Sequence, residues 1–501
     1  MTIYSINFGI GWASSGVEYA QAYRAKLLRH TNETARFIFL DFIQHENIQA
    51  LTHNIGFRND EVIWLYQYFT DIPIAPTTYR VDDLINDLSN PVQRVEHVGK
   101  IKRLILDNNA TFVTCYLTNE DTDIVHRAEF VINGMLVRKD FYSYVRVFSE
   151  YYAPKDNQAT LYMRQFYNED GSIAYQEYMA KDAKQSIYRF DDMICYGKLE
   201  LIAYFIKKLQ LSSEDIVILD RASEIGQAVL QNKGESRIGV VVHAEHFSEN
   251  LTDDDNILWN NYYEYQFSRA NDFDFFITAT EVQNRILSEQ LLKYKGLKPR
   301  IFTIPVGSLE KLKEPESHGR QPYAIMTASR LASEKHLDWL IKAVMKAKVE
   351  VPQLTFDIYG EGGEKEQLTT LVHTNEAQDY IKLRGHVNLS KVYAQYELFL
   401  SGSTSEGFGL TLMEAVGSGL GMIGLDVNYG NPTFISDQKN GYLIPYNTVE
   451  QTIEDIARAI VQYFNHGPTH PHETSYAIAE PFLTTHIIDK WKNLISEVLY
   501  D

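Results

Sequence analysis

The chain has 501 residues, of which 45% are hydrophobic and 23% are charged. This length predicts two or three domains, and the composition excludes a largely disordered or collagen-like chain. The formal net charge of −19 disfavours nucleic acid and anionic lipid as long-range partners, although a local basic pocket can still hold a phosphate.

The two cysteines, Cys115 and Cys195, are too few for a disulfide framework or a cysteine zinc cluster. We expect buried or half-buried thiols in a reducing compartment. No apolar run approaches the roughly 20 residues that span a bilayer. Residues 1–4 lead straight into a strand-like segment without the basic start of a secretory signal. The sequence therefore indicates a cytoplasmic protein.

The first 41 residues predict a strand, a helix and a second strand. Residues 3–7 read as a short buried strand, and a loop with glycines at positions 9, 11 and 16 follows it. Helical residues begin near Val17, and residues 37–41 read as the next strand. This order is typical of a parallel α/β sheet.

From about residue 93 to residue 178 the pattern changes to short β-rich runs, at 100–106, 112–117 and 129–132. Turn signals separate them, namely Asn108-Asn109, Asn133-Gly134, Asp156-Asn157 and Asp170-Gly171. Asn-Gly and Asp-Gly tolerate the positive φ of a tight hairpin, so we expect an antiparallel meander. Many of the 33 Tyr and 25 Phe fall between residues 60 and 200. Such an aromatic sheet can be a partner surface or can simply pack on its own domain.

The α/β pattern returns near Gly197, and two further series of strand-like runs follow. The first comprises 216–220, 238–243 and 273–277, and a linker-like stretch, 304–321, separates it from the second. The second comprises 323–328, 354–360, 381–385, 398–401 and 421–426. Near the end of the chain, residues 487–498 place apolar side chains on one face of a helix.

These shifts predict two doubly wound α/β domains with an antiparallel insertion in the first. We expect the N-terminal Rossmann-like domain at 1–75 and 196–315, and the insertion at 76–195. The C-terminal domain then spans 316–480, and a final helix, 481–501, crosses back to the N-terminal domain.

The densest group of candidate functional residues is 403–415. A buried strand delivers it to the carboxyl edge of a sheet, where open α/β folds bind ligands. Gly407 and Gly409 allow close backbone approach, and the helix that begins at Leu410 offers N–H groups that suit a phosphate. Glu406 lies in the loop and Glu414 about two turns inside the helix, so we expect them to address different parts of one extended ligand. Taken singly, each carboxylate has a structural alternative, as helix-start charge or as a solvated helix face.

Two cations follow the first strand of the C-terminal domain. Arg330 and Lys335 bracket a short loop and can reach one anionic group, Arg as a bidentate fork and Lys as a point charge. The alternative for Arg330 and Lys335 is surface pairing with Glu334. The glycine-rich turn at 359–364 is a weak signal by itself.

The N-terminal domain contributes the glycine loop and residues 242–246. Ser14 stands where a dinucleotide fingerprint needs glycine, although Asp41 keeps a dehydrogenase formally open. His243 ends an apolar strand and points to where ligands bind, unless it is a satisfied core histidine. His243 and His246 have no third ligand in view, so we discount a metal pair.

These motifs resemble the retaining glycosyltransferases of the glycogen-synthase-like family 4, which have the GT-B fold of two facing Rossmann-like domains. The resemblance rests on the Glu-x7-Glu pattern of Glu406 and Glu414, on the upstream Arg330 and Lys335, and on the glycine loop. A closer resemblance is to the GtfA-type subunits of accessory-Sec glycosyltransferase complexes. Residues 9–20, 241–246 and 405–414 carry it, and the meander lies where those subunits have an insertion. One departure is residues 419–421, where many relatives have a proline.

The resemblance implies a donor, an acceptor and a partner. The donor is UDP-N-acetylglucosamine or UDP-glucose, and the acceptor hydroxyls are those of Ser and Thr in a serine-rich repeat adhesin. The partner is a catalytically inactive GtfB-type subunit, bound by the meander, which also helps to recruit the acceptor. Peripheral association with the inner face of the cell membrane is compatible with this.

The resemblance also implies roles by position. Arg330 and Lys335 would hold the UDP diphosphate, Glu414 the ribose hydroxyls, and Glu406 the transferred sugar. In the segment from Gly407 to Leu410, the N–H groups of Phe408 and Gly409 would contact the sugar. His243 would lie by the anomeric region of the sugar, and Gly16 by the phosphates. Gly385, His386 and Val387 would surround the uracil. The cations and helix N–H groups would stabilise departing UDP without a metal. The acceptor hydroxyl would attack on the same face without a protein nucleophile, and the leaving phosphate would take its proton.

Two alternatives stay open at this point. One is a glucosyltransferase that decorates a poly-glycerol-phosphate teichoic acid, since such enzymes share the insertion and the Glu-x7-Glu pattern. The other is a non-catalytic interaction subunit, which the intact Arg330, Lys335, Glu406 and Glu414 argue against. The sequence does not separate N-acetylglucosamine from glucose.

Overall fold

The computed structural model describes residues 1–11, 15–31, 33–107, 109–156, 158–180, 185–316 and 319–500. Trp12, Ala13 and Ser14 of the predicted glycine loop lie outside the described residues, as do Asn108 and Asn157 of the predicted turns. The chain divides into two compact units, Met1–Gly239 and Val240–Asp501.

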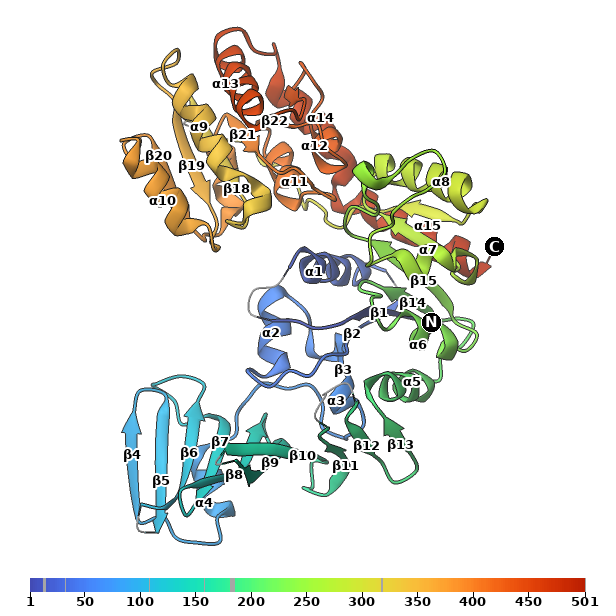
Figure 1. The fold of residues 1–501 in the computed structure, drawn as a ribbon, viewed down its shortest axis with the longest axis vertical. Helices are drawn as coiled ribbons and strands as arrows, with labels where there is room; N and C mark the ends of the chain where they lie inside the picture. The colour runs from blue at the N-terminus through green and yellow to red at the C-terminus, as the bar shows by residue number, and fades with distance from the viewer. Residues whose placement is uncertain are drawn as a thin grey trace. The chain divides into compact units, whose positions relative to one another are not determined.

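The first sheet has seven parallel strands in the order β17-β16-β15-β14-β1-β2-β3 (Figure 1). The strands β14 and β16 are buried along their length and β15 is buried after its first residue, as expected when helices cover both faces of a parallel sheet. The strands are β1 Thr2–Asn7, β2 Thr34–Phe39, β3 Val62–Trp64, β14 Ile216–Leu219, β15 Arg237–Val242, β16 Phe275–Thr278 and β17 Ile301–Thr303. The helices of this part are α1 Gly16–Leu28, α2 Ile48–Ile55, α3 Leu65–Tyr68, α4 Val81–Asp87, α5 Lys198–Lys208, α6 Gly226–Asn232, α7 Glu264–Ser268 and α8 Glu281–Lys295.

Between α4 and α5 the chain forms a ten-stranded antiparallel sheet in sequence order, coloured cyan to green in Figure 1. Gly134 and Gly171 sit at hairpin turns with φ of 77° and 83°, as the Asn-Gly and Asp-Gly signals predict. The strands are β4 Arg94–Val98, β5 Ile101–Asp107, β6 Thr111–Leu117, β7 Val125–Ile132, β8 Met135–Tyr142, β9 Arg146–Lys155, β10 Gln158–Tyr167, β11 Ile173–Tyr178, β12 Ile187–Arg189 and β13 Ile194–Tyr196.

The aromatic side chains of the insertion continue into the residues that follow β2. The Phe42 ring lies 5.3 Å from the Phe148 ring and 6.3 Å from the Phe166 ring. The Arg164 guanidinium lies 3.9 Å from the centre of the Phe42 ring, and it forms ion pairs with Glu150 and Glu177 at 2.9 and 3.0 Å. Part of the aromatic content therefore packs within this unit.

The third sheet has six parallel strands in the order β20-β19-β18-β21-β22-β23. This order changes direction between β18 and β21, which is where open α/β sheets bind ligands. The strands are β18 Ala324–Ala328, β19 Thr355–Tyr359, β20 Ile381–Gly385, β21 Leu398–Ser401, β22 Gly421–Leu425 and β23 Gly441–Ile444. The helices are α9 Leu337–Ala347, α10 Lys365–Thr374, α11 Leu410–Gly417, α12 Gly430–Phe434, α13 Val449–His466, α14 Pro471–Ala479 and α15 Thr484–Tyr500.

The C-terminal helix α15 contacts the strand β17 and the residue before it. Lys490 Nζ donates to the carbonyl of Thr303 at 3.2 Å, and Arg300 Nη1 donates to the carbonyl of Glu497 at 2.6 Å. The buried face of α15 consists of Ile487, Trp491, Leu494, Ile495 and Val498. The apolar positions of the sequence thus mark the buried face.

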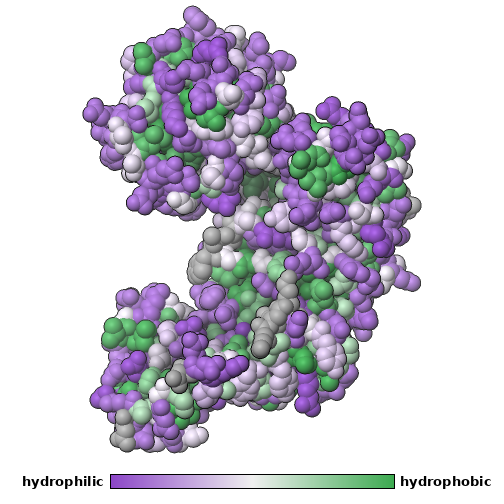
Figure 2. All heavy atoms as spheres, viewed as in Figure 1, coloured by the Kyte–Doolittle hydropathy of each residue, from purple (hydrophilic) through white to green (hydrophobic). Residues whose placement is uncertain are grey.

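The protein has the mixed α/β architecture expected from the sequence, with two parallel sheets and an antiparallel insertion. Cys115 and Cys195 are both buried free thiols, and burial raises the pKa of Cys195 to about 11. Hydrophilic side chains cover most of the face shown in Figure 2. Among the helices of the described residues, none combines the length and the apolar character that crossing a membrane requires.

Candidate active site

The loop after β21 carries Glu406 to the carboxyl edge of the six-stranded sheet. Gly409 caps α11 with a left-handed φ of 86°, a conformation that favours glycine. The Phe408 side chain is buried, with its ring centre 5.2 Å from that of Phe434, so only the backbone of Phe408 is available to a ligand at this loop. Leu410 opens the helix and is half-buried. The first N–H groups of a helix have no partner within it, which makes this edge suited to an anion.

Glu414 lies in α11, just over one turn from the start of the helix, rather than the two turns expected from the sequence. The helix begins at Leu410, as the sequence predicts, so the sequence analysis placed Glu414 too far into the helix. The Tyr393 hydroxyl donates to Glu414 Oε2 at 2.9 Å, and the Tyr393 ring is 1% exposed. Sequence analysis did not single out Tyr393, because an aromatic residue between short helical turns reads as ordinary core.

Lys335 and Glu406 form the central ion pair of the site. Lys335 Nζ lies 2.7 Å from Glu406 Oε2, and the two side chains are 18% and 21% exposed. Ser403 Oγ lies at 3.5 Å from the same carboxylate oxygen. The cation and the carboxylate, predicted separately from the sequence, therefore meet at one place.

Arg330 follows β18, and its side chain is 72% exposed. Its Nη2 lies 2.7 Å from Glu334 Oε1, which is the surface pairing that the sequence left open as an alternative. An exposed pair of this kind contributes little to stability. Breaking this ion pair so that the Arg330 guanidinium can bind an anionic ligand therefore costs little free energy.

The glycine-rich turn after β19 supports the backbone around Arg330. A Cβ added to Gly360 would lie 1.9 Å from the carbonyl oxygen of Ser329, and one added to Gly362 would lie 2.3 Å from that of Leu331. The N–H of Leu331 donates to the carbonyl of Glu361 at 2.9 Å. The turn at 359–364, which is a weak signal in the sequence, thus packs its backbone closely against the loop that carries Arg330.

The segment after β15 reaches the same loop. His243 is half-buried, and a Cβ added to Gly407 would lie 2.4 Å from the His243 carbonyl oxygen. Ser405 Oγ donates to Glu245 Oε2 at 3.3 Å, and burial raises the pKa of Glu245. It is His246, rather than His243, that is a fully buried histidine with hydrogen bonds to Tyr429 and Gln290.

Gly385 ends β20, and His386 and Val387 follow it in the next turn. Gly385 has a φ of 72°, and its carbonyl accepts from the N–H of Gly360 at 2.9 Å. The side chains of His386 and Val387 are exposed. A backbone hydrogen bond therefore joins this segment to the glycine-rich turn at 359–364.

Gly16 belongs to the other compact unit, where it opens α1. Ser15 and Glu18 form a capping box there: the Ser15 hydroxyl accepts from Val17 at 3.3 Å, and Glu18 Oε2 accepts from the N–H of Ser15 at 2.6 Å. Arg221 Nη2 donates to Ser15 Oγ at 2.7 Å. The Ser-x-x-Glu spacing is the signal by which the sequence could have shown this cap.

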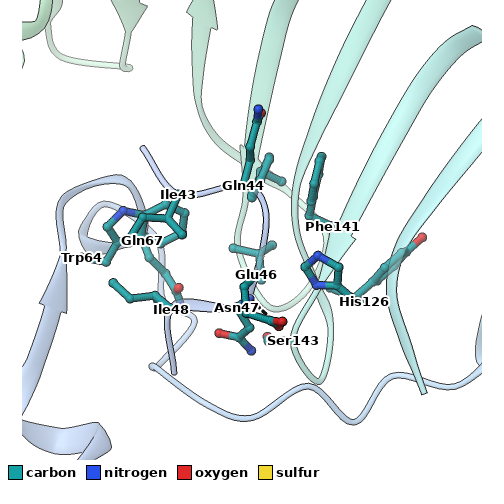
Figure 3. Close-up of a pocket in the computed structure, with 13 residues that line it drawn as sticks. Ile43, Gln44, Glu46, Asn47, Ile48, Trp64, Gln67, His126, Phe141 and Ser143 are labelled. Atoms are coloured by element: carbon teal, nitrogen blue, oxygen red, sulfur yellow. Dashed lines mark hydrogen bonds between the residues drawn. The ribbon is translucent and has the colours of Figure 1, made fainter. Parts of the chain in front are cut away.

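Two pockets in Met1–Gly239 share the segment after β2. A pocket of about 320 Å³ is lined by Gly9, Gly11 and residues 41–46, and a second, of about 30 Å³, lies where that segment meets the insertion. In Figure 3, Glu46 lies between His126 on one side and Trp64 on the other. Burial lowers the pKa of His126.

The fold and the site define a glycosyltransferase of the GT-B class. Residues 309–470 match the family described as glycosyl transferases group 1, and residues 94–192 match the GtfA extended beta-sheet domain. A relative from Streptococcus gordonii, the GtfA subunit of UDP-N-acetylglucosamine–peptide N-acetylglucosaminyltransferase, is 53% identical over 505 residues, covering 100% of this chain and 99% of the relative. This chain belongs to that GtfA subunit family.

Solved structures agree with this assignment. The pneumococcal O-GlcNAc transferase GtfA, in complex with UDP and GlcNAc, is 52% identical with a TM-score of 0.93, covering 100% of this chain and 99% of that one. A GtfA/B complex contains a chain that is 52% identical with a TM-score of 0.96, at full coverage of both chains. A Bacillus subtilis poly(glycerol-phosphate) alpha-glucosyltransferase is only 23% identical over 76% of this chain and 55% of its own length, so the teichoic-acid alternative corresponds to a distant relative.

Proposed function

We propose that this chain transfers N-acetylglucosamine from UDP-N-acetylglucosamine to Ser and Thr hydroxyls of a polypeptide, with retention of configuration at the anomeric carbon. The observation that carries this proposal is the ion pair of Lys335 and Glu406 at the carboxyl edge of the sheet, one loop away from Arg330. Relatives and structures at 52–53% identity over the full chain support the donor and the reaction.

The chemistry of the site follows from charge. When the glycosidic bond to UDP breaks, negative charge grows on the diphosphate, and preorganised cations and N–H donors stabilise it best where water is excluded. Lys335 supplies one cation, already held at 2.7 Å from Glu406, and Arg330 supplies another. The donor diphosphate would share Lys335 with Glu406. The cations and the N-terminus of α11 would stabilise the leaving group without a metal ion.

The remaining side chains fit the rest of an extended UDP-sugar. Glu414, held by Tyr393, is proposed to accept hydrogen bonds from the ribose hydroxyls. Glu406 and the N–H groups of Phe408 and Gly409 are proposed to hold the transferred sugar, with His243 by its anomeric carbon. Further proposed contacts are Gly407 and Leu410 in the same segment, Gly385, His386 and Val387 around the uracil, and Gly16 by the phosphates.

The acceptor is proposed to be a serine-rich polypeptide, and the partner a GtfB-type subunit, as in the solved GtfA/B complex. The insertion is the proposed partner surface. Its last strands and the start of α5 expose large apolar side chains, namely Ile173, Tyr178, Ile187, Met193, Ile194, Tyr196 and Leu199. A group of exposed apolar residues of this kind is typical of an interaction site.

The proposed location is the cytoplasm, where nucleotide sugars are made, and two free buried thiols fit a reducing compartment. Peripheral association with the inner face of the membrane is compatible with this location.

The experiment is mass spectrometry of a serine-rich polypeptide incubated with this chain, a GtfB-type subunit and either UDP-N-acetylglucosamine or UDP-glucose. We expect a mass increase of one N-acetylhexosamine at Ser or Thr. Transfer of glucose alone would correct the donor, and transfer only to a glycerol-phosphate polymer would refute the acceptor.

A further inference from the structure

The backbone of Glu406 is held by the segment that follows β22. Glu406 and Tyr429 form a parallel bridge, in which the N–H groups of Tyr429 and Gly430 donate to the Glu406 carbonyl at 2.7 and 2.8 Å. The approach is close, because a Cβ added to Gly430 would lie 2.9 Å from Glu406 Cγ. The position of Glu406 therefore depends on where Tyr429 is placed.

The side chain of Tyr429 runs into the protein toward the segment after β15. Its phenol is fully buried, and its hydroxyl lies 2.7 Å from His246 Nδ1. On the other side of the imidazole, Nε2 lies 2.8 Å from Gln290 Oε1 on α8. The rings of Tyr429 and His246 stack, with centroids 5.6 Å apart and planes at 16°.

The three groups form a hydrogen-bond chain with a defined direction. Burial lowers the pKa of His246 to about 4, so its imidazole is neutral at physiological pH. Because Gln290 presents its carbonyl oxygen, Nε2 carries the proton and Nδ1 accepts from the Tyr429 hydroxyl. Both imidazole nitrogens and the phenol are thereby satisfied in a buried environment, where an unmet bond is costly.

Further hydrogen bonds fix the backbone next to His246. The N–H of Ala244 donates to the Tyr263 hydroxyl at 3.0 Å, and the carbonyl of Ala244 accepts from Gln283 Nε2 at 2.9 Å. His243 is next to Ala244, so it shares this fixed backbone. The contact of Ser405 with Glu245 also joins the two segments, but Ser405 is exposed and Glu245 is only half-buried, so water competes for this hydrogen bond.

We propose that Tyr429 and His246 are positioning residues for glycosyl transfer: their buried hydrogen bond fixes the loop that carries Glu406 against the segment that carries His243. Neither side chain is assigned a contact with the sugar. This inference rests on the proposed function, in which Glu406 and His243 both face the transferred sugar. A displacement of about 1 Å at a reacting group can cost about 100-fold in rate, so one hydrogen bond can matter here.

The first test is Tyr429→Phe, which removes the hydroxyl and keeps the ring and the backbone bonds. In the complex of this chain with its GtfB-type partner, we expect kcat for transfer to a serine-rich polypeptide to fall about tenfold or more. KM for UDP-N-acetylglucosamine should stay within about twofold, because Arg330, Lys335 and Glu414, which are assigned to the nucleotide, lie outside the loop that Tyr429 holds. The matched control is Tyr463→Phe, which loses a buried hydroxyl bonded at 3.3 Å to the Glu397 carbonyl, at the opposite end of β21.

The control separates positioning from general loss of stability. Both variants should lower Tm by a similar amount, and only Tyr429→Phe should lower kcat. Equal kcat in the wild type and Tyr429→Phe, or an equal fall in both variants, would overturn the inference. Absence of transfer by the wild type would instead overturn the proposed function.

A second pair of variants guards against misfolding of the first. His246→Gln keeps an acceptor for Tyr429 and a donor for Gln290, so it should retain most of the wild-type kcat. His246→Leu should lose as much as Tyr429→Phe, and the double variant Tyr429→Phe/His246→Leu should be no slower than either single variant. Additive losses in the double variant, or no difference between Gln and Leu at position 246, would contradict the inference.

Discussion

Replacing Lys335 with alanine tests whether this cation stabilises the negative charge that develops on the departing diphosphate. The variant removes a cation whose Nζ lies 2.7 Å from Glu406 and leaves that carboxylate without its counter-charge beside the departing diphosphate. Removal of one preorganised donor to a developing anion costs about 2.7–4 kcal/mol, or about 100- to 1,000-fold in kcat. We expect kcat/KM for UDP-N-acetylglucosamine to fall by about this factor.

The cost of Lys335→Ala in folding stability should be far smaller. Exposed ion pairs contribute up to about 1 kcal/mol, and this pair is only partly buried. The matched control is Lys342→Ala, which breaks a 2.8 Å pair with Asp338 within α9. We measure initial rates of transfer and thermal unfolding for both variants. If kcat/KM of Lys335→Ala stays within about threefold of the wild type, or falls no more than that of Lys342→Ala, the reasoning is wrong.

Three further predictions address other parts of the site. Glu414→Gln should raise the Kd for UDP about tenfold by calorimetry, because one charge-assisted hydrogen bond to the ribose is weakened; an unchanged Kd would remove Glu414 from the nucleotide site. Gly407→Ala should lower both Tm and kcat, since the new Cβ would lie 2.4 Å from the His243 carbonyl, whereas Gly363→Ala, with open space around it, should be neutral. Burial lowers the pKa of His246 to about 4, so the unfolded chain binds a proton at this residue more readily than the folded chain does. The free energy of unfolding should therefore fall by about 3 kcal/mol between about pH 6.5 and pH 4. An equally steep fall in the His246→Gln variant would show that it has another origin.

Local patterns in the sequence were enough to predict the main architecture. Asn133-Gly134 and Asp170-Gly171 predict hairpin turns, because few other residues take positive φ at low cost, and the structure has both. The buried runs of the third sheet stand out for a similar reason, since strands covered on both faces are apolar throughout. The sequence analysis did not single out the strands β3, β17 and β23, which have three or four residues, or the longer strands β8, β9 and β10 of the insertion.

Within the site, the sequence could show which residues have suitable chemistry but not which of them meet. Lys335 and Glu406 are 71 positions apart, and their ion pair depends on how β18 and β21 neighbour each other. The link between Tyr429 and His246 spans 183 positions and consists of residues that read as ordinary core. Long-range pairs of this kind depend on sheet order, which no local pattern encodes.

The central claim is that Arg330 and Lys335 hold the diphosphate of the donor while Glu414 holds its ribose. The most direct measurement is a crystal structure of this chain with UDP. We expect phosphate oxygens within hydrogen-bonding distance of Arg330 and Lys335, and a ribose hydroxyl bonded to the Glu414 carboxylate. Ordered UDP bound away from these three side chains would contradict the account.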